Sequence, residues 1–338
     1  MRSRLALRLR RGSEVALSEA EEARKNVGDP PQSVGGVAIV LALVLVVAVW
    51  MSLQDEPSGS PVEMERLSRL TASLGDLPGF RSDAWFLPDD ELLGFEEIPA
   101  GPFLMGSDPA IDAMSFDNEW WPGASPRAIL NVPTFYIGRV EVTVAQFAAF
   151  VQQTQYRADD AAFGSPPDHP VASVSWTDAL AYARWLDSTL RTWSETPAEL
   201  GQRFRDGWRI SLPSEVQWEK AARGADGRVY PWGNEPRRDR ANFAGRSTVP
   251  VGSFPCPECP FGLLDMSGNV WEWTRSPYQA YPYDESDDRE GLDSDALWVM
   301  RGGAFNDTER NVRTAIRGGA DPGVRRPFIG FRLVISPF

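Results

Sequence analysis

Residues 261–273 read FGLLDMSGNVWEW and are the most informative stretch of this chain. Asp265 and Glu272 lie on either side of a Gly-Asn turn, so both carboxylates can converge on one cation. Calcium prefers several oxygens in a flexible cage and accepts backbone carbonyls among them. A turn stiffened by two tryptophans can supply such carbonyls at fixed positions. The alternative interpretation is a tight structural turn with buried tryptophans and solvated acids.

The composition limits the kinds of protein to which this chain can belong. The chain has 338 residues, 42% of them hydrophobic, and its 28 Pro and 29 Gly indicate short elements joined by many loops. Its net charge of −13 argues against non-specific nucleic-acid binding, which needs a basic surface. The single histidine, His169, argues against histidine-rich metal centres and against Ser-His or Cys-His triads.

A membrane anchor is predicted at residues 34–53, VGGVAIVLALVLVVAVWMSL. Twenty helical residues span roughly 30 Å, which is the hydrocarbon thickness of a bilayer. A buried core helix would not be this apolar on every face, and a cleaved signal peptide normally has a shorter apolar region. We therefore expect a retained single-pass transmembrane helix, with the lipid bilayer as one partner.

The orientation follows from the positive charges. Seven bases precede residue 34, whereas the residues just after the apolar stretch are acidic, beginning with Asp55 and Glu56. Lys and Arg favour the cytoplasmic side of a membrane. We expect residues 1–33 to form a cytoplasmic tail in a cell inner membrane, and the part after the anchor to be periplasmic or otherwise extracytoplasmic.

The outer part divides into a linker and one domain. Residues 54–94 are predicted as a linker with a short helix at 63–74, and residues 95–338 as an α+β domain rich in irregular loops. Three helices have start signals: Thr143, Thr177, and Ser214 with Gln217 as a capping box. Residues 284–295 contain seven acids and one base and are interpreted as a solvated loop without EF-hand spacing.

Several motifs in a fixed order resemble the formylglycine-generating-enzyme, or sulfatase-modifying-factor, family. They are IPAGPFLMGS (98–107), EVT (141–143), HPVASVSWTDA (169–179), RISLPSEVQWEKAARG (209–224), YPWGN (230–234), the opening stretch, RGGAF (301–305) and GFR (330–332). The resemblance covers about residues 95–338. It implies a variant of the C-type-lectin-like fold, preceded here by the transmembrane helix.

The resemblance also implies a structural calcium site in the opening stretch. Carried across from the family, Asp265 and Glu272 supply carboxylates, and Gly268 and Val270 supply carbonyls. A second family calcium site begins near the equivalents of Asn242 and Phe243, but residues 244–249 lack the acid that would complete it.

Catalysis is where the sequence departs from the family. The family's oxidase uses two cysteines after the Arg-Gly-Gly motif to hold copper(I), a soft ion that prefers thiolates. Here that segment reads AFNDTERNVRTAIR (304–317) and has no cysteine, so no copper is expected. The related iron-dependent sulfoxide synthases use a histidine cluster, which a chain with one histidine cannot supply.

Cys256 and Cys259 form a C-x-x-C pair. They are either a redox dithiol or half of a soft-metal site, or a small disulfide that closes a loop in an oxidising compartment. We favour the disulfide, because a four-thiol zinc site needs two more cysteines than the chain has.

The sequence therefore predicts a non-enzymatic, membrane-anchored accessory subunit. Its extracytoplasmic domain would bind and stabilise partner proteins of a membrane complex, for which a photosynthetic or respiratory complex is one candidate host. One alternative is a lectin-like module for a small ligand or glycan, since the fold offers a face built from loops. The other is a thiol-dependent modifying oxidoreductase that uses Cys256 and Cys259.

Overall fold

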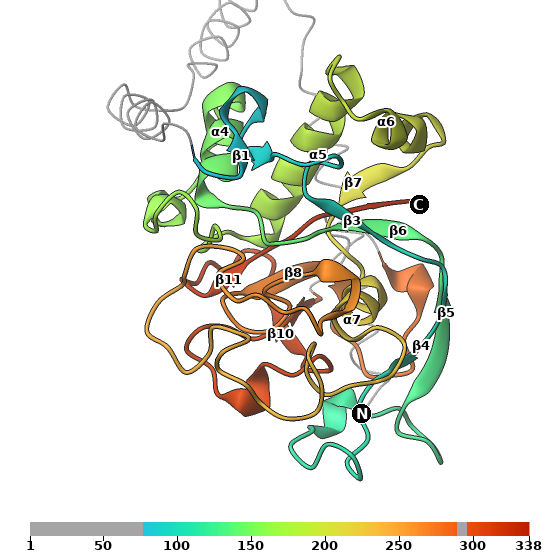
Figure 1. The fold of residues 1–338 in the computed structure, drawn as a ribbon. Helices are drawn as coiled ribbons and strands as arrows, with labels where there is room; N and C mark the ends of the chain where they lie inside the picture. The colour runs from blue at the N-terminus through green and yellow to red at the C-terminus, as the bar shows by residue number, and fades with distance from the viewer. Residues whose placement is uncertain (1–76, 289–295, 338) are drawn as a thin grey trace, which may run out of the picture. The chain divides into compact units, whose positions relative to one another are not determined.

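Four α-helices, twelve short strands and long loops make up the part of the chain that the structure describes, residues 77–288 and 296–337 of a computed structural model (Figure 1). The helices are α4 (Val144–Thr154), α5 (Trp176–Thr192), α6 (Ala198–Arg205) and α7 (Glu215–Arg223). The strands are β1 (Phe80–Arg81), β2 (Leu87–Pro88), β3 (Phe95–Ile98), β4 (Gly101–Met105), β5 (Ala128–Val132), β6 (Phe135–Gly138), β7 (Arg209–Ser211), β8 (Trp271–Pro277), β9 (Trp298–Arg301), β10 (Gly318–Ala320), β11 (Ile329–Gly330) and β12 (Val334–Ser336). This mixture agrees with the predicted α+β class.

Two four-stranded sheets organise these elements. The first has the order β3-β6-β12-β7 and is antiparallel throughout, with Val334 paired to both Ile137 and Ser211. The second has the order β10-β9-β8-β11, and β11 runs parallel to β8. Strands β4 and β5 form a separate two-stranded sheet, and so do β1 and β2.

Two of the three predicted helix starts are confirmed. Thr143 caps α4 and Ser214 caps α7, each in a reciprocal capping box with a glutamine three residues on. The third prediction is wrong by two residues, because α5 begins at Trp176 and is capped by Ser175. The Ser175 hydroxyl accepts from the Asp178 amide, and the Asp178 carboxylate accepts from the Ser175 amide, so Thr177 lies inside the helix.

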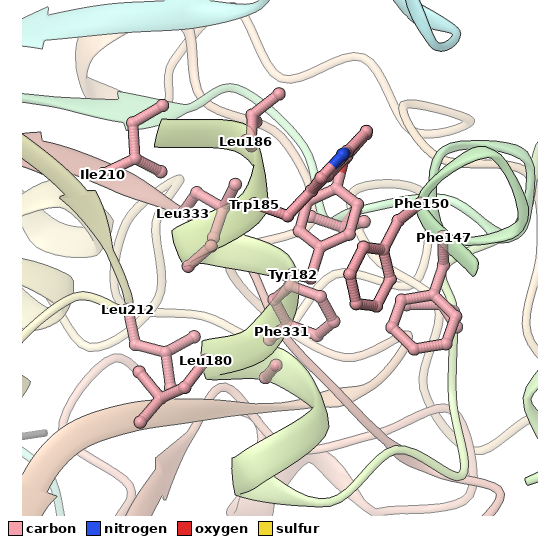
Figure 2. Close-up of a cluster of buried hydrophobic side chains, with 14 of the residues drawn as sticks. Phe147, Phe150, Leu180, Tyr182, Trp185, Leu186, Ile210, Leu212, Phe331 and Leu333 are labelled. Carbon is pink, nitrogen blue, oxygen red and sulfur yellow. The ribbon is translucent and has the colours of Figure 1, made fainter. Parts of the chain in front are cut away.

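An aromatic core lies where α4 and α5 meet the first sheet (Figure 2). Phe150 of α4 lies 5.6 Å from Tyr182 and 5.4 Å from Trp185, both of α5, between ring centroids. Phe331, just before β12, contacts Tyr182 edge-on at 5.5 Å. Burying each such side chain contributes about 1.5–3 kcal/mol. The helices are therefore held to the sheet by packing of aromatic and aliphatic side chains.

The packed region begins before residue 95. Leu87 and Leu93 are almost fully buried in the core around α4 and α5, so part of the predicted linker belongs to the domain. Among the residues that the structure describes, no helix is long and apolar enough to cross a membrane. The predicted anchor at 34–53 and the predicted helix at 63–74 lie outside those residues.

Candidate functional site

The opening stretch forms a tightly packed corner that leads into β8. Gly268 has a φ of +80°, and a Cβ there would lie 2.2 Å from the Asn242 carbonyl oxygen, so no other residue fits without a shift of the backbone. The Asn269 amide donates to that carbonyl at 2.9 Å, and the Gly268 amide donates to Gly302 at 2.9 Å. The Gly-Asn turn therefore joins the loop at 242 to the Arg-Gly-Gly segment.

Glu272 of β8 is fully buried and is bound by a guanidinium. Arg332 Nε donates to its Oε2 and Arg332 Nη2 donates to its Oε1, each at 2.6 Å. The Trp218 indole of α7 donates to the same Oε2 at 2.7 Å. Both oxygens of Glu272 are thus occupied by protein donors, and its charge is matched by Arg332.

Asp265 lies in the same buried region but is not bonded to Arg332. Its Oδ2 accepts from the Gly252 amide at 2.6 Å, while its Oδ1 has no partner among the described residues. Burial raises the pKa of Asp265 to about 6. Burial and the neighbouring Asp265 charge also raise the pKa of Glu141 well above its usual range. The region thus holds three buried carboxyls, those of Asp265, Glu141 and Glu272, near the guanidinium of Arg332.

The calcium site predicted for Asp265, Gly268, Val270 and Glu272 stays a prediction. Asp265 Oδ1 and Glu141 Oε2 are buried and have no hydrogen-bond partner among the described residues, whereas both oxygens of Glu272 accept from Arg332. Calcium takes six to eight oxygens, usually with carboxylates free to bind it. Glu272 Oε2 accepts from both Arg332 and Trp218, whereas Oε1 accepts from Arg332 alone and keeps one acceptor site. Within residues 77–288 and 296–337 there is also no group of three or more His, Cys, Asp or Glu that could hold a metal ion. Arg332 supplies positive charge next to Glu272.

A second buried ionic network joins α7 to the segment after β9. Arg301 donates to Glu215 at 3.0 Å and to Glu219 at 2.6 Å. Arg317 donates to both oxygens of Glu215, and Arg223 donates to Glu219 at 2.6 Å. All five side chains are buried. Three guanidiniums share two carboxylates, and the network holds the Arg-Gly-Gly segment against the helix.

Segment 304–317, which follows the Arg-Gly-Gly motif, is built around Asp307. Its Oδ2 accepts from the Trp271 indole at 2.8 Å and from the Ala304 amide at 3.0 Å, and its Oδ1 accepts from Asn311 at 3.0 Å. Further along, Arg313 donates to Asp112 and Glu119 in a buried ion pair. The side chains of Asp307 and Arg313 are thus both bonded to other residues of the protein.

The remaining predicted site residues are the two cysteines. Cys256 and Cys259 are joined by a disulfide in the structure, in the loop just before the opening stretch. Cys256 is buried against Val229 and Phe243 in a small hydrophobic cluster, and Cys259 packs at its edge. Between the two cysteines, Glu258 is an exposed surface residue that pairs with Arg240 at 2.8 Å. The disulfide lies in a packed loop.

Comparison with known proteins identifies the family to which this fold belongs. The model of the sulfatase-modifying factor enzyme 1-like domain matches residues 91–337. The chain belongs to the sulfatase-modifying-factor family. The predicted family fold is therefore shown.

Relatives within the sulfatase-modifying-factor family include enzymes and inactive members. Hercynine oxygenase of Mycolicibacterium smegmatis is 30% identical, over 70% of this chain and 60% of its own length. Inactive C-alpha-formylglycine-generating enzyme 2 of Mus musculus is 30% identical, over 71% of this chain and 84% of its own length. The structure of PvdO from Pseudomonas aeruginosa matches with a TM-score of 0.57 and 26% identity, over 72% of this chain and 94% of that chain.

The chain thus spans only about 60% of the length of the hercynine oxygenases that it matches. The family match establishes a common fold for enzymes and inactive proteins alike. Activity therefore has to be argued from the residues of this chain.

One feature of the family domain that sequence reasoning missed is a surface groove. Its volume is about 930 Å³, and it lies between β5 with the residues after it and the loop at 282–288. Four carboxylates and one guanidinium line it: Asp284, Glu285, Asp287, Asp288 and Arg275. The acid-rich composition of 284–295 was visible in the sequence, but it did not show that residues 284–288 line a groove together with residues of β5.

Proposed function

We propose that this chain is a non-enzymatic accessory subunit of a membrane complex. In this proposal residues 34–53 anchor it in the bilayer, and the sulfatase-modifying-factor domain binds and stabilises partner proteins on the extracytoplasmic face. Photosynthetic and respiratory assemblies are candidate hosts in this proposal.

The arrangement around Asp307 carries the proposal. The activity of the family's oxidase would require two cysteine thiols in segment 304–317, and this segment has none. Asp307 instead accepts hydrogen bonds from Trp271, Ala304 and Asn311, which satisfies its carboxylate within the loop. A carboxylate held in this way neither binds copper(I) as a thiolate does nor presents a nucleophile. The relatives named as inactive formylglycine-generating enzymes support the same conclusion.

The direct test is to purify the full chain from native membranes in a mild detergent. We expect it to co-purify with other membrane proteins in a fixed ratio. As a control, a variant with a substitution outside the groove that leaves the charge unchanged should co-purify with the same proteins. Recovery of only the free monomer, at detergent concentrations that preserve other complexes of the same membrane, would contradict the proposal.

The enzymes among the relatives require a separate test of the thiol-dependent alternative. The C-x-x-C disulfide is the one redox-active group that the described residues offer. We expect a Cys256→Ser, Cys259→Ser double variant to retain the same co-purifying proteins. Loss of a measurable oxidation or reduction of those proteins in the double variant, with association intact, would favour the oxidoreductase reading instead.

A further inference from the structure

The outer edge of β5 lacks a strand neighbour in the described structure. Strand β5 pairs with β4 on one side, and these two strands make up their sheet. The opposite side of β4 is occupied by α7, whose Arg223 donates to the Leu104 carbonyl at 3.2 Å. Of the two strands, β5 therefore carries the open edge.

The register shows which backbone groups face outward. Asn131 pairs with Pro102, which has no N–H to donate, so this pair suits a non-hydrogen-bonded position of the antiparallel ladder. By alternation, Ile129 opposite Leu104 occupies the same kind of position, and the Leu104 carbonyl does point away from β5 toward Arg223. The N–H and C=O groups of Ile129 and Asn131 thus face away from β4, and they have no hydrogen-bond partner among the described residues.

Within the described structure, strand β5 itself contains no lysine, proline or bulge. Natural edge strands avoid pairing through lysines, prolines, bulges or a covering element. Strand β5 reads Ala-Ile-Leu-Asn-Val, pairs in unbroken register with β4, and exposes 70% of Ile129. A five-residue edge of this kind is a template for an added strand.

The charge of the groove favours a positively charged added strand. Asp284, Glu285 and Asp287 line the groove, and none of them forms an ion pair with a residue that the structure describes. The Asp284 carboxylate also accepts from the Ser286 amide and hydroxyl, which lowers its pKa and keeps it ionised. A strand lying along β5 would therefore meet negative charge on its other side.

We propose that the β5 edge and the acidic loop 284–288 bind an extended, positively charged segment of a partner protein. The segment adds to β5 as a third strand through the backbone groups of Ile129 and Asn131. Its Lys or Arg side chains, at alternate positions, face the carboxylates of the loop. This inference rests on the proposed function, because it names the chemistry of the partner that the accessory subunit holds.

The test measures binding of a fluorescent synthetic peptide to the full chain in mild detergent, by anisotropy. The peptide alternates valine with lysine and matches β5 in length, and a second peptide alternates valine with glutamate. We expect the lysine peptide to bind with an affinity that falls as salt is raised, since the exposed charges are then screened. We expect the glutamate peptide not to bind.

Two variants locate the site. Asn131→Pro removes one outward N–H and should weaken binding roughly tenfold, whereas Asn131→Thr keeps the N–H and should bind as the unchanged chain does. The triple variant Asp284→Asn, Glu285→Gln, Asp287→Asn leaves β5 untouched and should remove most of the salt dependence. Its matched control is Glu91→Gln, Glu235→Gln, Glu309→Gln, which removes the same charge from exposed positions outside the groove.

The proposal is overturned if the lysine peptide does not bind, if Asn131→Pro and Asn131→Thr bind equally, or if the control triple variant loses as much as the groove variant. The two proposals fail separately. Partners that co-purify from membranes while the peptide does not bind would overturn only the β5 site. Peptide binding at β5 by a chain that purifies as a free monomer would overturn only the accessory-subunit function.

Discussion

Glu272 and Arg332 form the buried ion pair on which the corner of the opening stretch depends. Removing one partner of a buried pair leaves an uncompensated charge, which typically costs about 3–5 kcal/mol. We therefore expect Arg332→Leu to lower the free energy of unfolding by about that amount, measured by chemical denaturation. The control is Arg326→Leu at an exposed position, where a change within about 0.5 kcal/mol is expected. Equal effects of the two variants would show that the pair does not stabilise the fold.

The Glu272–Arg332 ion pair also leads to a prediction about the removal of calcium. Because Arg332 occupies both oxygens of Glu272, we expect chelation of calcium with EGTA to leave the thermal unfolding midpoint unchanged. Addition of excess calcium should likewise have no effect. A midpoint that falls with EGTA and recovers with calcium, but not with magnesium, would contradict this expectation and support the calcium site implied by the family resemblance.

The buried carboxyl of Asp288 makes the free energy of unfolding fall as the pH rises. Burial raises its pKa to about 6, against hydrogen bonds from Ser276 and Tyr283 that lower it. The folded state thus binds the proton more tightly than the unfolded state. The stability from this group is fully present below about pH 4 and is lost as pH rises to about 6. We expect Asp288→Asn to reduce the fall in unfolding free energy between these pH values. An unchanged slope would contradict the shifted pKa.

At the scale of elements, local sequence predicts a helix where a cap and an apolar face coincide. Helices α4 and α7 have both signals, and their starts are confirmed. Helix α6 was missed because Pro197 precedes it and no side chain caps it. For α5, Ser175 and Thr177 are both capping residues by type. The choice between them depends on the reciprocal bond with Asp178, which residue type alone does not reveal.

The start of α5 can be tested by two matched substitutions. Loss of an N-cap hydroxyl costs about 1 kcal/mol, so Ser175→Ala should lower the free energy of unfolding by roughly that amount. Thr177→Ala removes a hydroxyl that bonds only to Ser175 and should cost clearly less. Thermal or chemical unfolding of both variants decides the matter, and a larger cost for Thr177→Ala would restore the original prediction.

At the scale of the whole molecule, the sequence indicates the fold through ordered motifs, but not the partners of their charged residues. Asp265 and Glu272 look equivalent in sequence, yet only Glu272 meets Arg332, which comes from sixty residues later. The β5 groove depends likewise on two segments far apart in the chain. Residues 1–76 and 289–295 carry the predicted anchor and part of the acidic loop, and both lie outside the described structure.

The position of β12 has a consequence for biosynthesis. This strand lies between β6 and β7, and its backbone completes the ladders of both. A nascent chain that has already produced residues 135–211 still has two unpaired strand edges, and they stay unpaired until residues 334–336 leave the ribosome. The first sheet therefore closes only after synthesis is nearly complete, and during that interval chaperones have the best opportunity to bind the exposed edges.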